Sequence, residues 1–492
     1  MSFVKACFER FSGCKDYEQF MTFWKEAPMF DSEKMPEEAK EQFTKCKDMA
    51  ARFYPFVKGI IPLPEGVLQH MWFAKLWDSF LVSFSITFFL LPVQLFYYYE
   101  IYPYAILLNI IVLPLFSIVL YLGFAGGAVG IVSPFFGKLI LLPCEYIFGF
   151  YLWICKKIEL LPANRIIVGE PSRVQMIVFY ALLLGLIGLA ENSRRKKENP
   201  SLGRRLAYFL VCCMACFILC ARIRWNTRIV FLDVGQGDGI YISSQDGANV
   251  FIDGGSSSVK KVGEYRILPF LKSKGVSHID YWFVSHTDED HMNGLLEVME
   301  SGYIINHLVI SKYMIRDEAY DTLISCAEQH KISILEMRKG DAVASKDFRI
   351  ECIYPNREIF EDKNDMSLAL KLSLGTCTGI FAGDFSSEAE QILVQEHLID
   401  PVDIYKVNHH GSKNSSSEEF MNLIQPRISI ISCAKRNRYG HPADEAMERI
   451  EAEGSNLFYT MNGGQICVKV QGEHIEVTEF VKQLAVEMNF EQ

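Results

Sequence analysis

The stretch VSHTDEDHMNG, from Val284 to Gly294, decides the fold and carries its chemistry. It follows a β-rich run and places His286, Asp288, Asp290 and His291 within six positions. Alternate residues at the end of such a run can converge on one point. Imidazoles and carboxylates suit zinc, manganese or iron, and repulsion between the carboxylates favours a bound cation. We therefore predict a metal site here, rather than a solvated acidic loop that caps a helix.

Three later β-rich runs also end in candidate ligands. GIFAGD ends in Asp384, a carboxylate suited to bridging two metals about 3.5–4 Å apart. DIYKV leads into the adjacent His409 and His410, which point to opposite sides of an extended chain, so that one can bind metal while the other contacts substrate or packs. ISIISC leads into NRYGHP, which contains Arg438 and His441. Four such run ends predict one shared active-site rim.

The surrounding sequence predicts a single α/β domain of roughly 250 residues from about residue 225 onward. Short β-rich runs bounded by Gly, Asn, Asp or Ser alternate there with amphipathic stretches. The predicted helices cover Glu264–Ser273, Asn293–Ser301, Asp317–His330, Ser386–His397, Ser416–Ile424 and Pro442–Glu453.

The preceding part of the chain is strongly apolar. Two runs between Asp78 and Gly130 can each cross a hydrocarbon core of about 30 Å, joined by a tight EIYP hairpin. Val174–Ala190 and Leu206–Ala221 are two further predicted spans. The run Val129–Ile154 contains two charges and is split by two prolines, so it predicts either a fifth span or a broken, re-entrant segment.

Charge near the last two spans predicts the orientation. The densest basic cluster lies between them and comprises Arg194, Arg195, Lys196, Lys197, Arg204 and Arg205. The positive-inside rule places that loop in the cytoplasm, and everything after Ala221 outside the membrane. We expect a polar helical lead-in at residues 1–70 without a cleavable signal peptide, a membrane region at 71–224, a hydrolase domain at 225–478 and a tail at 479–492.

Composition narrows the function classes. Hydrophobic residues make up 50% of the 492 positions, which excludes a disordered or collagenous chain. The 14 cysteines lack the spacing of a disulfide framework or a zinc ribbon. By count, residues 225–492 hold about 25 Lys and Arg against about 41 Asp and Glu, which is unusual for a domain that binds a polyanion. DNA contact would depend on local basic clusters such as Lys435, Arg436 and Arg438.

These motifs resemble a known family. SHTDEDH is similar to the metallo-β-lactamase-fold signature HxHxDH in its variant form HxDxDH, with Asp288 in place of the second histidine. FLDVGQGDG, IDGG, AGD, HHGSK and NRYGHP, in this order, resemble the extracytoplasmic domain of the ComEC family of DNA-uptake competence proteins. The stretch SFSITFFLLPVQLFYYYEIYPYAILLNIIVLPL resembles the late part of that family's membrane region. Because the family also carries an OB-like domain and more helices before this region, the chain is expected to begin partway through it.

The resemblance implies a helical membrane bundle followed by an αββα sandwich that binds one or two divalent ions, zinc or manganese. It implies that His286 and Asp288 hold a first metal, that Asp290 and His291 hold a second, and that Asp384 bridges them. The remaining ligands would be His410 or His409, together with His441. Asp253 in IDGG is expected to orient a ligand, as are Asp233 and His409.

The implied chemistry is metal-assisted hydrolysis. Asp290, with Asp288, would orient the nucleophile, and Ser412, Lys413 and Arg438 would bind phosphate near the Gly411 turn. The implied function is a nuclease in the cell membrane that degrades the non-imported strand during DNA uptake, acting on single-stranded DNA without sequence preference. Other competence proteins or self-association would complete the channel. The alternatives are a truncated or structural channel component with an idle site, and a hydrolase of a small extracellular ester or phosphodiester.

Overall fold

Two units make up the chain, Met1–Ala221 and Arg222–Gln492. The computed structural model describes residues 71–196, 201–222, 224, 226–472, 474–481 and 485–489. The predicted lead-in at residues 1–70 lies outside the described residues.

Five helices of the first unit are long and apolar enough to cross a membrane. They are α4 (Met71–Tyr98), α5 (Ala105–Val132), α6 (Pro134–Glu159), α7 (Arg173–Arg195) and α8 (Leu202–Cys220). The doubtful fifth run is one of them, because α6 continues through Pro143 and the chain breaks at Ser133 instead. Pro134 then occupies the first turn, where a missing N–H costs no helical hydrogen bond.

Glycines set the contact between α5 and α6. A Cβ atom on Gly137 would lie 2.6 Å from the Cα of Gly130 and 2.9 Å from the carbonyl oxygen of Gly126. Such close backbones are typical of small-residue contacts between membrane helices. By contrast, Gly149 on the same helix has open space around its Cα.

A second apolar contact joins α4, α7 and α8. Leu81 and Phe89 of α4 pack in one buried cluster with Phe179 of α7 and Leu219 of α8. A two-residue strand, β1 (Glu100–Ile101), follows α4 and pairs antiparallel with β2 (Ile166–Ile167). The EIYP junction therefore contributes a strand to a small ribbon as well as a connection between helices.

The second unit is built on two sheets. The nine-stranded sheet comprises β18 (Ala485–Asn489), β17 (His474–Glu479), β16 (Ile466–Gln471), β3 (Thr227–Phe231), β4 (Gly239–Ser243), β5 (Asn249–Asp253), β6 (His278–Phe283), β7 (Ile304–Ser311) and β8 (Ser333–Met337), in this order. The seven-stranded sheet comprises β15 (Asn456–Tyr459), β14 (Ile428–Ile431), β13 (Ile404–Lys406), β12 (Cys377–Phe381), β11 (Ala369–Leu374), β10 (Arg349–Tyr354) and β9 (Ala342–Ala344).

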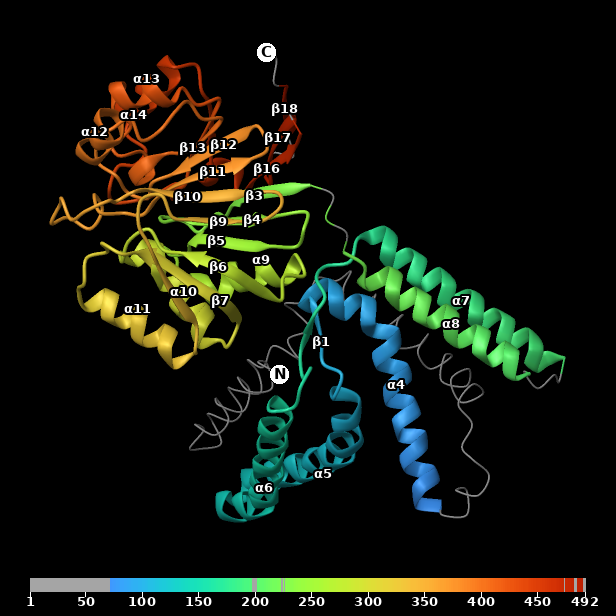
Figure 1. The fold of residues 1–492 in the computed structure, drawn as a ribbon. Helices are drawn as coiled ribbons and strands as arrows, with labels where there is room; N and C mark the ends of the chain where they lie inside the picture. Colours follow the sequence, from blue (N-terminus) through green and yellow to red (C-terminus); the bar gives the residue numbers. More distant parts are fainter. Residues whose placement is uncertain are drawn as a thin grey trace. The chain divides into compact units, whose positions relative to one another are not determined.

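Helices cover the outer faces of both sheets (Figure 1). The main core lies between the sheets and includes Phe231, Phe283 and Phe381, all of them buried. The helices α9 (Leu268–Ser273), α10 (Glu289–Glu300) and α11 (Glu318–Gln329) lie along the nine-stranded sheet, and α12 (Ser387–Gln395), α13 (Glu418–Ile424) and α14 (Asp444–Ala452) along the other. The predicted αββα sandwich after a set of apolar helices is confirmed.

The strand ends position the site. Strands β5 to β8 run parallel, as do β12 to β15. The segments that leave β6, β12 and β13 at their carboxyl ends carry the candidate ligands, which is where α/β sheets usually place their sites.

Two predicted boundaries were wrong. Helix α10 begins at Glu289, four residues before the predicted Asn293, so Asp290 and His291 lie in its first turn and not in a loop. The residues 479–492, predicted as a tail, include β18, which pairs with β17 at the edge of the sheet.

Candidate metal centre

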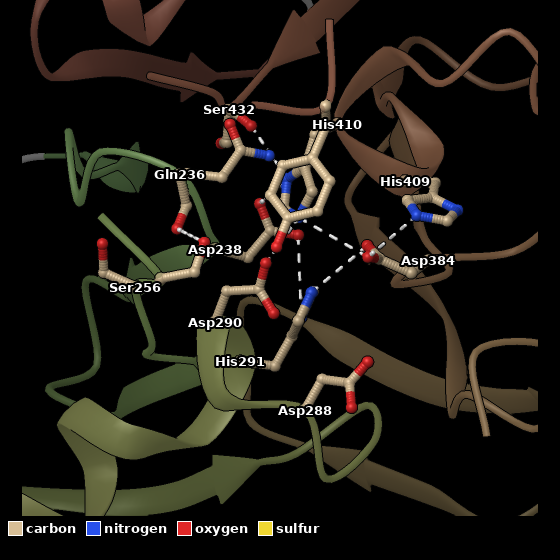
Figure 2. Close-up of polar contacts among 12 residues, drawn as sticks. Gln236, Asp238, Ser256, Asp288, Asp290, His291, Asp384, His409, His410 and Ser432 are labelled. Atoms are coloured by element: carbon tan, nitrogen blue, oxygen red, sulfur yellow. Dashed lines mark hydrogen bonds and ion pairs between the residues drawn. The ribbon is translucent and has the colours of Figure 1, made fainter. Parts of the chain in front are cut away.

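Four buried side chains, from four separate segments, converge beside the strand ends. They are Asp238, His291, Asp384 and His410, and one donor atom from each lies within 4.8 Å of the others. The Nε2 atom of His291 is 3.2 Å from Asp384 Oδ1, and that of His410 is 3.5 Å from Asp384 Oδ2 (Figure 2). Across the part of the chain that the structure describes, this is the one group with three or more such ligands.

Both histidines present Nε2 to Asp384 because their Nδ1 atoms are occupied. Nδ1 of His410 donates to the carbonyl oxygen of Ser432 at 2.9 Å. Nδ1 of His291 lies 3.0 Å from Asp253 Oδ2. A proton held on Nδ1 leaves the Nε2 lone pair free for a cation, which is the usual arrangement of a metal-binding histidine.

Asp253 is itself fixed in place. Its Oδ1 accepts from the backbone N–H of Ser285 at 2.7 Å, and its Oδ2 accepts from the Ser285 hydroxyl at 3.0 Å. The side chain therefore lies where the resemblance expects a carboxylate that orients a ligand, beside His291.

Two glycines allow the first turn of α10 to approach the neighbouring loops. A Cβ on Gly255 would lie 2.3 Å from the carbonyl carbon of Asp290, and one on Gly237 would lie 2.5 Å from the Asp290 oxygen. Next to Gly237, the N–H of Asp238 donates to that oxygen at 3.1 Å. Glycine at these positions brings Asp238, Asp290 and His291 together.

The turn that carries His409 and His410 has an unusual backbone. Both residues have positive φ, 49° and 54°, in the turn η3 (Asn408–Gly411). The predicted extended chain was wrong at this point, because left-handed residues replace the alternation of an extended strand. His410 faces the interior, whereas His409 is about one-third exposed with Nε2 3.9 Å from Asp384 Oδ2.

A buried carboxylate holds that turn. Glu390 of α12 accepts from Asn408 Nδ2 at 2.9 Å, from the N–H of Ser416 at 2.7 Å and from the N–H of Ser417 at 2.8 Å. Burial raises the pKa of Glu390, against the opposing effect of these hydrogen bonds. The three contacts offset the cost of a left-handed turn that two histidines would otherwise rarely adopt.

Asp238 was not predicted as a site residue, and neither was its partner Lys406. The Lys406 side chain is 1% exposed, and its Nζ lies 2.6 Å from Asp238 Oδ2. Asp238 approaches the Nδ1 atoms of the histidines, at 3.7 Å from His410 and 3.9 Å from His291. It therefore lies behind the imidazoles and is paired with a cation already. A lysine within the apolar run DIYKV was the sequence signal for it.

Asp290 lies on the other side of the imidazoles. Its Oδ2 is 3.7 Å from His410 Nε2, the atom that also faces Asp384 (Figure 2). Asp290 is therefore better placed than Asp238 to bind a cation held by the Nε2 atoms of the two histidines. Carboxylate oxygens of Asp290 and Asp384 thus lie on the Nε2 side of His291 and His410, and all four residues were predicted ligands.

His286 and Asp288 lie beside this set. His286 is buried, with Nδ1 3.2 Å from the Ser367 hydroxyl and Nε2 3.6 Å from Asp288 Oδ2. Lys363 forms an ion pair with Asp288 Oδ1. Burial would raise the pKa of Asp288, but the contacts with His286 and Lys363 outweigh it and lower that pKa.

The remaining predicted residues surround the cluster at varying distance. His441 is half-buried, its ring centroid 5.5 Å from that of His409, and burial together with His409 and His410 lowers its pKa to about 4. Arg438 is exposed and lies over the Tyr439 ring at 4.9 Å. Ser412 is buried and Lys413 exposed, directly after the histidine turn. Asp233 does not join the cluster, since it pairs with Arg266 at 3.1 Å.

The donor set fits a divalent cation. His286 Nε2, His291 Nε2, His410 Nε2 and Asp384 Oδ1 are buried and have no hydrogen-bond partner among the described residues. Burial acts to raise the pKa of Asp384, but His410 and His291 outweigh it and keep that pKa well below its ordinary value. A carboxylate beside imidazole Nε2 atoms is a ligand set that zinc and manganese accept.

Comparisons with known proteins agree with these features. Residues 57–192 match the Competence protein family, and residues 232–435 match the metallo-beta-lactamase superfamily. ComE operon protein 3 of Bacillus subtilis is 25% identical over 392 residues, which cover 76% of this chain and 50% of that protein. Recombination protein 2 of Haemophilus influenzae is 23% identical over 435 residues, which cover 82% of this chain and 51% of that protein. Competence protein ComA of Neisseria gonorrhoeae is 28% identical over 244 residues, covering 49% and 32%.

The chain spans about half the length of the first two relatives. The predicted resemblance to the ComEC family is confirmed by a competence-protein segment joined to a metallo-β-lactamase-superfamily domain.

Proposed function

Since the chain joins a competence-protein segment to a metallo-β-lactamase-superfamily domain, we propose that it is a membrane-anchored, metal-dependent phosphodiesterase that cleaves single-stranded DNA during DNA uptake. The observation that carries the proposal is the buried group His291, Asp384 and His410, whose donor atoms lie close together and have no hydrogen-bond partner among the described residues. The strand that is not imported would be the substrate.

A divalent cation held there would activate a water molecule and polarise a phosphoryl oxygen. Asp253 and the Ser432 carbonyl hold the two imidazoles with their Nε2 atoms toward that point. Asp290 is more exposed than the other ligands, so its carboxylate can orient the attacking water and accept its proton. In this arrangement Asp384 supplies the central negative charge.

Substrate binding would use the rim beside the histidine turn. Ser412 and Lys413 directly follow His410, and Arg438 belongs to the loop that carries His441. Lys413 and Arg438 are exposed and would contact phosphate oxygens, with Arg438 giving up its hydrogen bond to the Tyr439 hydroxyl. The excess of acidic residues in this unit means that DNA binding is weak and depends on these few cations.

The five apolar helices and the competence-family match support a membrane protein. We infer a multi-pass topology in which the basic residues around Arg204 lie in the cytoplasm and the hydrolase domain lies outside, next to incoming DNA. Other competence proteins or further copies of the chain would complete the path across the membrane.

The test uses the full chain in detergent with Mn²⁺ or Zn²⁺ and an end-labelled single-stranded oligonucleotide. The wild type should cleave it, and Asp384→Asn should reduce the rate by about 100-fold or more, because it removes the shared negative charge. Asp233→Asn, a change outside the cluster, is the matched control. Unchanged cleavage by Asp290→Ala would contradict the proposal, and a folded wild type without turnover would favour a structural channel component.

A second candidate is favoured by the acidity of this unit, where about 41 Asp and Glu outnumber about 25 Lys and Arg. A small phosphodiester has fewer charges to be repelled than a DNA strand. Competition between an oligonucleotide and bis(p-nitrophenyl) phosphate distinguishes the two. Preferential turnover of the small diester would replace DNA as the substrate.

A further inference from the structure

We propose that this domain binds one divalent cation with high affinity, and that the ammonium group of Lys363 takes the charge-balancing place of a second one beside Asp288. The inference rests on the proposed function, because it concerns the cation of the same site. The sequence motifs allow either one or two ions, and the proposal is for one.

Lys363 is held between two carboxylates. Its Nζ pairs with Asp288 Oδ1 and lies 3.5 Å from Asp317 Oδ2. Asp317 is fixed in turn, since its Oδ1 caps α11 by accepting from the N–H of Tyr320 at 2.8 Å. Thr287, next to Asp288, also donates to that oxygen at 3.3 Å. The ammonium is therefore part of a connected network and not a freely moving surface charge.

This network removes a ligand from any second ion. Such an ion would need His286 and Asp288 together with a share of Asp384. His286 Nε2 lies 3.6 Å from Asp288 Oδ2 and has no hydrogen-bond partner within the described part of the chain. Asp288 Oδ1, however, is already paired with the ammonium group of Lys363, and a second ion would bring two positive charges next to that ammonium. Repulsion between like charges over a few ångströms makes that addition unfavourable in a partly buried site.

The other lysine of the site acts differently. Lys406 pairs with Asp238 behind the imidazoles, on the Nδ1 side, and leaves their Nε2 atoms open. Lys363 instead pairs with Asp288, which is the first aspartate of the HxDxDH motif. One lysine thus supports the primary cation site, and the other occupies the neighbouring one.

Metal stoichiometry tests this on the full chain in detergent, freed of metal with chelator and titrated with Mn²⁺. Mn²⁺ is chosen because it prefers oxygen and imidazole ligands over the thiols of α8. Equilibrium dialysis with elemental analysis counts the ions, and electron paramagnetic resonance separates an isolated Mn²⁺ from a coupled pair. We expect one isolated ion per chain in the wild type.

Substituting Lys363→Met frees Asp288 and should raise the count to two, with a coupled signal. Lys363→Gln serves as a second variant that keeps a polar side chain near Asp317. The matched control is Lys371→Met. Lys371 lies on β11 and pairs with Asp400, so this variant should still bind one ion.

Two ions in the wild type, or one in both Lys363 variants, would overturn the inference. A wild type that binds two ions and still cleaves DNA refutes this inference alone. A wild type that binds no Mn²⁺ refutes the proposed function together with it.

Discussion

Replacing Asp253 with asparagine should weaken cation binding, because it favours the tautomer of His291 that carries its proton on Nε2 instead of Nδ1. The carboxylate accepts three contacts, from the Ser285 N–H at 2.7 Å, the Ser285 hydroxyl at 3.0 Å and His291 Nδ1 at 3.0 Å. An amide has only one acceptor oxygen. When that oxygen remains on the Ser285 N–H, the amide NH₂ faces a protonated Nδ1, and two donors meet.

The conflict is relieved when His291 moves its proton to Nε2, the atom that faces Asp384 at 3.2 Å. To bind Nε2, a cation must then displace that proton. The proton either leaves the ring or returns to Nδ1, where it again meets the amide NH₂ at position 253. Loss of a carboxylate that orients a metal ligand costs about 10–100-fold in affinity. We expect the upper end, about 100-fold or about 2.7 kcal/mol, because the amide opposes the correct tautomer in addition to weakening a contact.

The assay is Mn²⁺ titration of the full chain, with circular dichroism to confirm that the variant is folded. Asp233→Asn is the matched control, since Asp233 pairs with Arg266 outside the cluster. An affinity within threefold of the wild type for folded Asp253→Asn would refute this account of how His291 is oriented.

Three further predictions concern stability. Glu390→Ala leaves two buried donors and one half-buried donor without this acceptor, so it should lower the free energy of local opening at residues 408–417 by about 3 kcal/mol, measured by hydrogen exchange. Unchanged exchange there would contradict the role given to Glu390. Burial raises the pKa of Glu390, so the folded state binds the proton more tightly than the unfolded state, and this group's contribution to stability falls as pH rises from about 4.5 through the folded pKa. Glu390→Gln should remove that slope from the thermal midpoint between pH 4.5 and 7, and identical slopes in the two proteins would argue against it. Gly137→Leu should destabilise the α5–α6 pair by about 2 kcal/mol, seen as a lower thermal midpoint in detergent, whereas Gly149→Leu, with open space around it, should have little effect; equal shifts would exclude the close glycine contact.

The parts of the site that could be predicted from sequence are those that are local along the chain. His286, Asp288, Asp290 and His291 lie within six positions, and Asp384 ends an apolar run. Each group follows the carboxyl end of a parallel strand, which is where α/β sheets usually place their sites. Four of the five apolar helices were predicted as spans, because hydropathy over about 20 residues reports directly on a membrane environment, whereas the prolines and charges of the fifth run left its prediction open.

What sequence reasoning missed depends on contacts between distant segments. Asp238 and Lys406 pair across the two sheets, and Lys363 reaches Asp288 from a loop without a recognisable motif. The extended backbone predicted at His409 and His410 was wrong because a left-handed turn, held by Glu390, replaces it, although the two side chains face different surroundings as predicted. A lysine pairing has no local signature, and a positive φ is uncommon outside glycine even though histidine and asparagine adopt it more often than most residues.

The ligand-facing residues come from both layers of the sandwich. Asp290 and His291 begin a helix that follows β6 of the nine-stranded sheet, whereas Asp384 and His410 follow β12 and β13 of the seven-stranded sheet. A cation bound between them would cross-link the two layers of the domain at one edge. Removing it with a chelator would then loosen the sandwich, so resistance of the domain to proteolysis would depend on the supply of the ion.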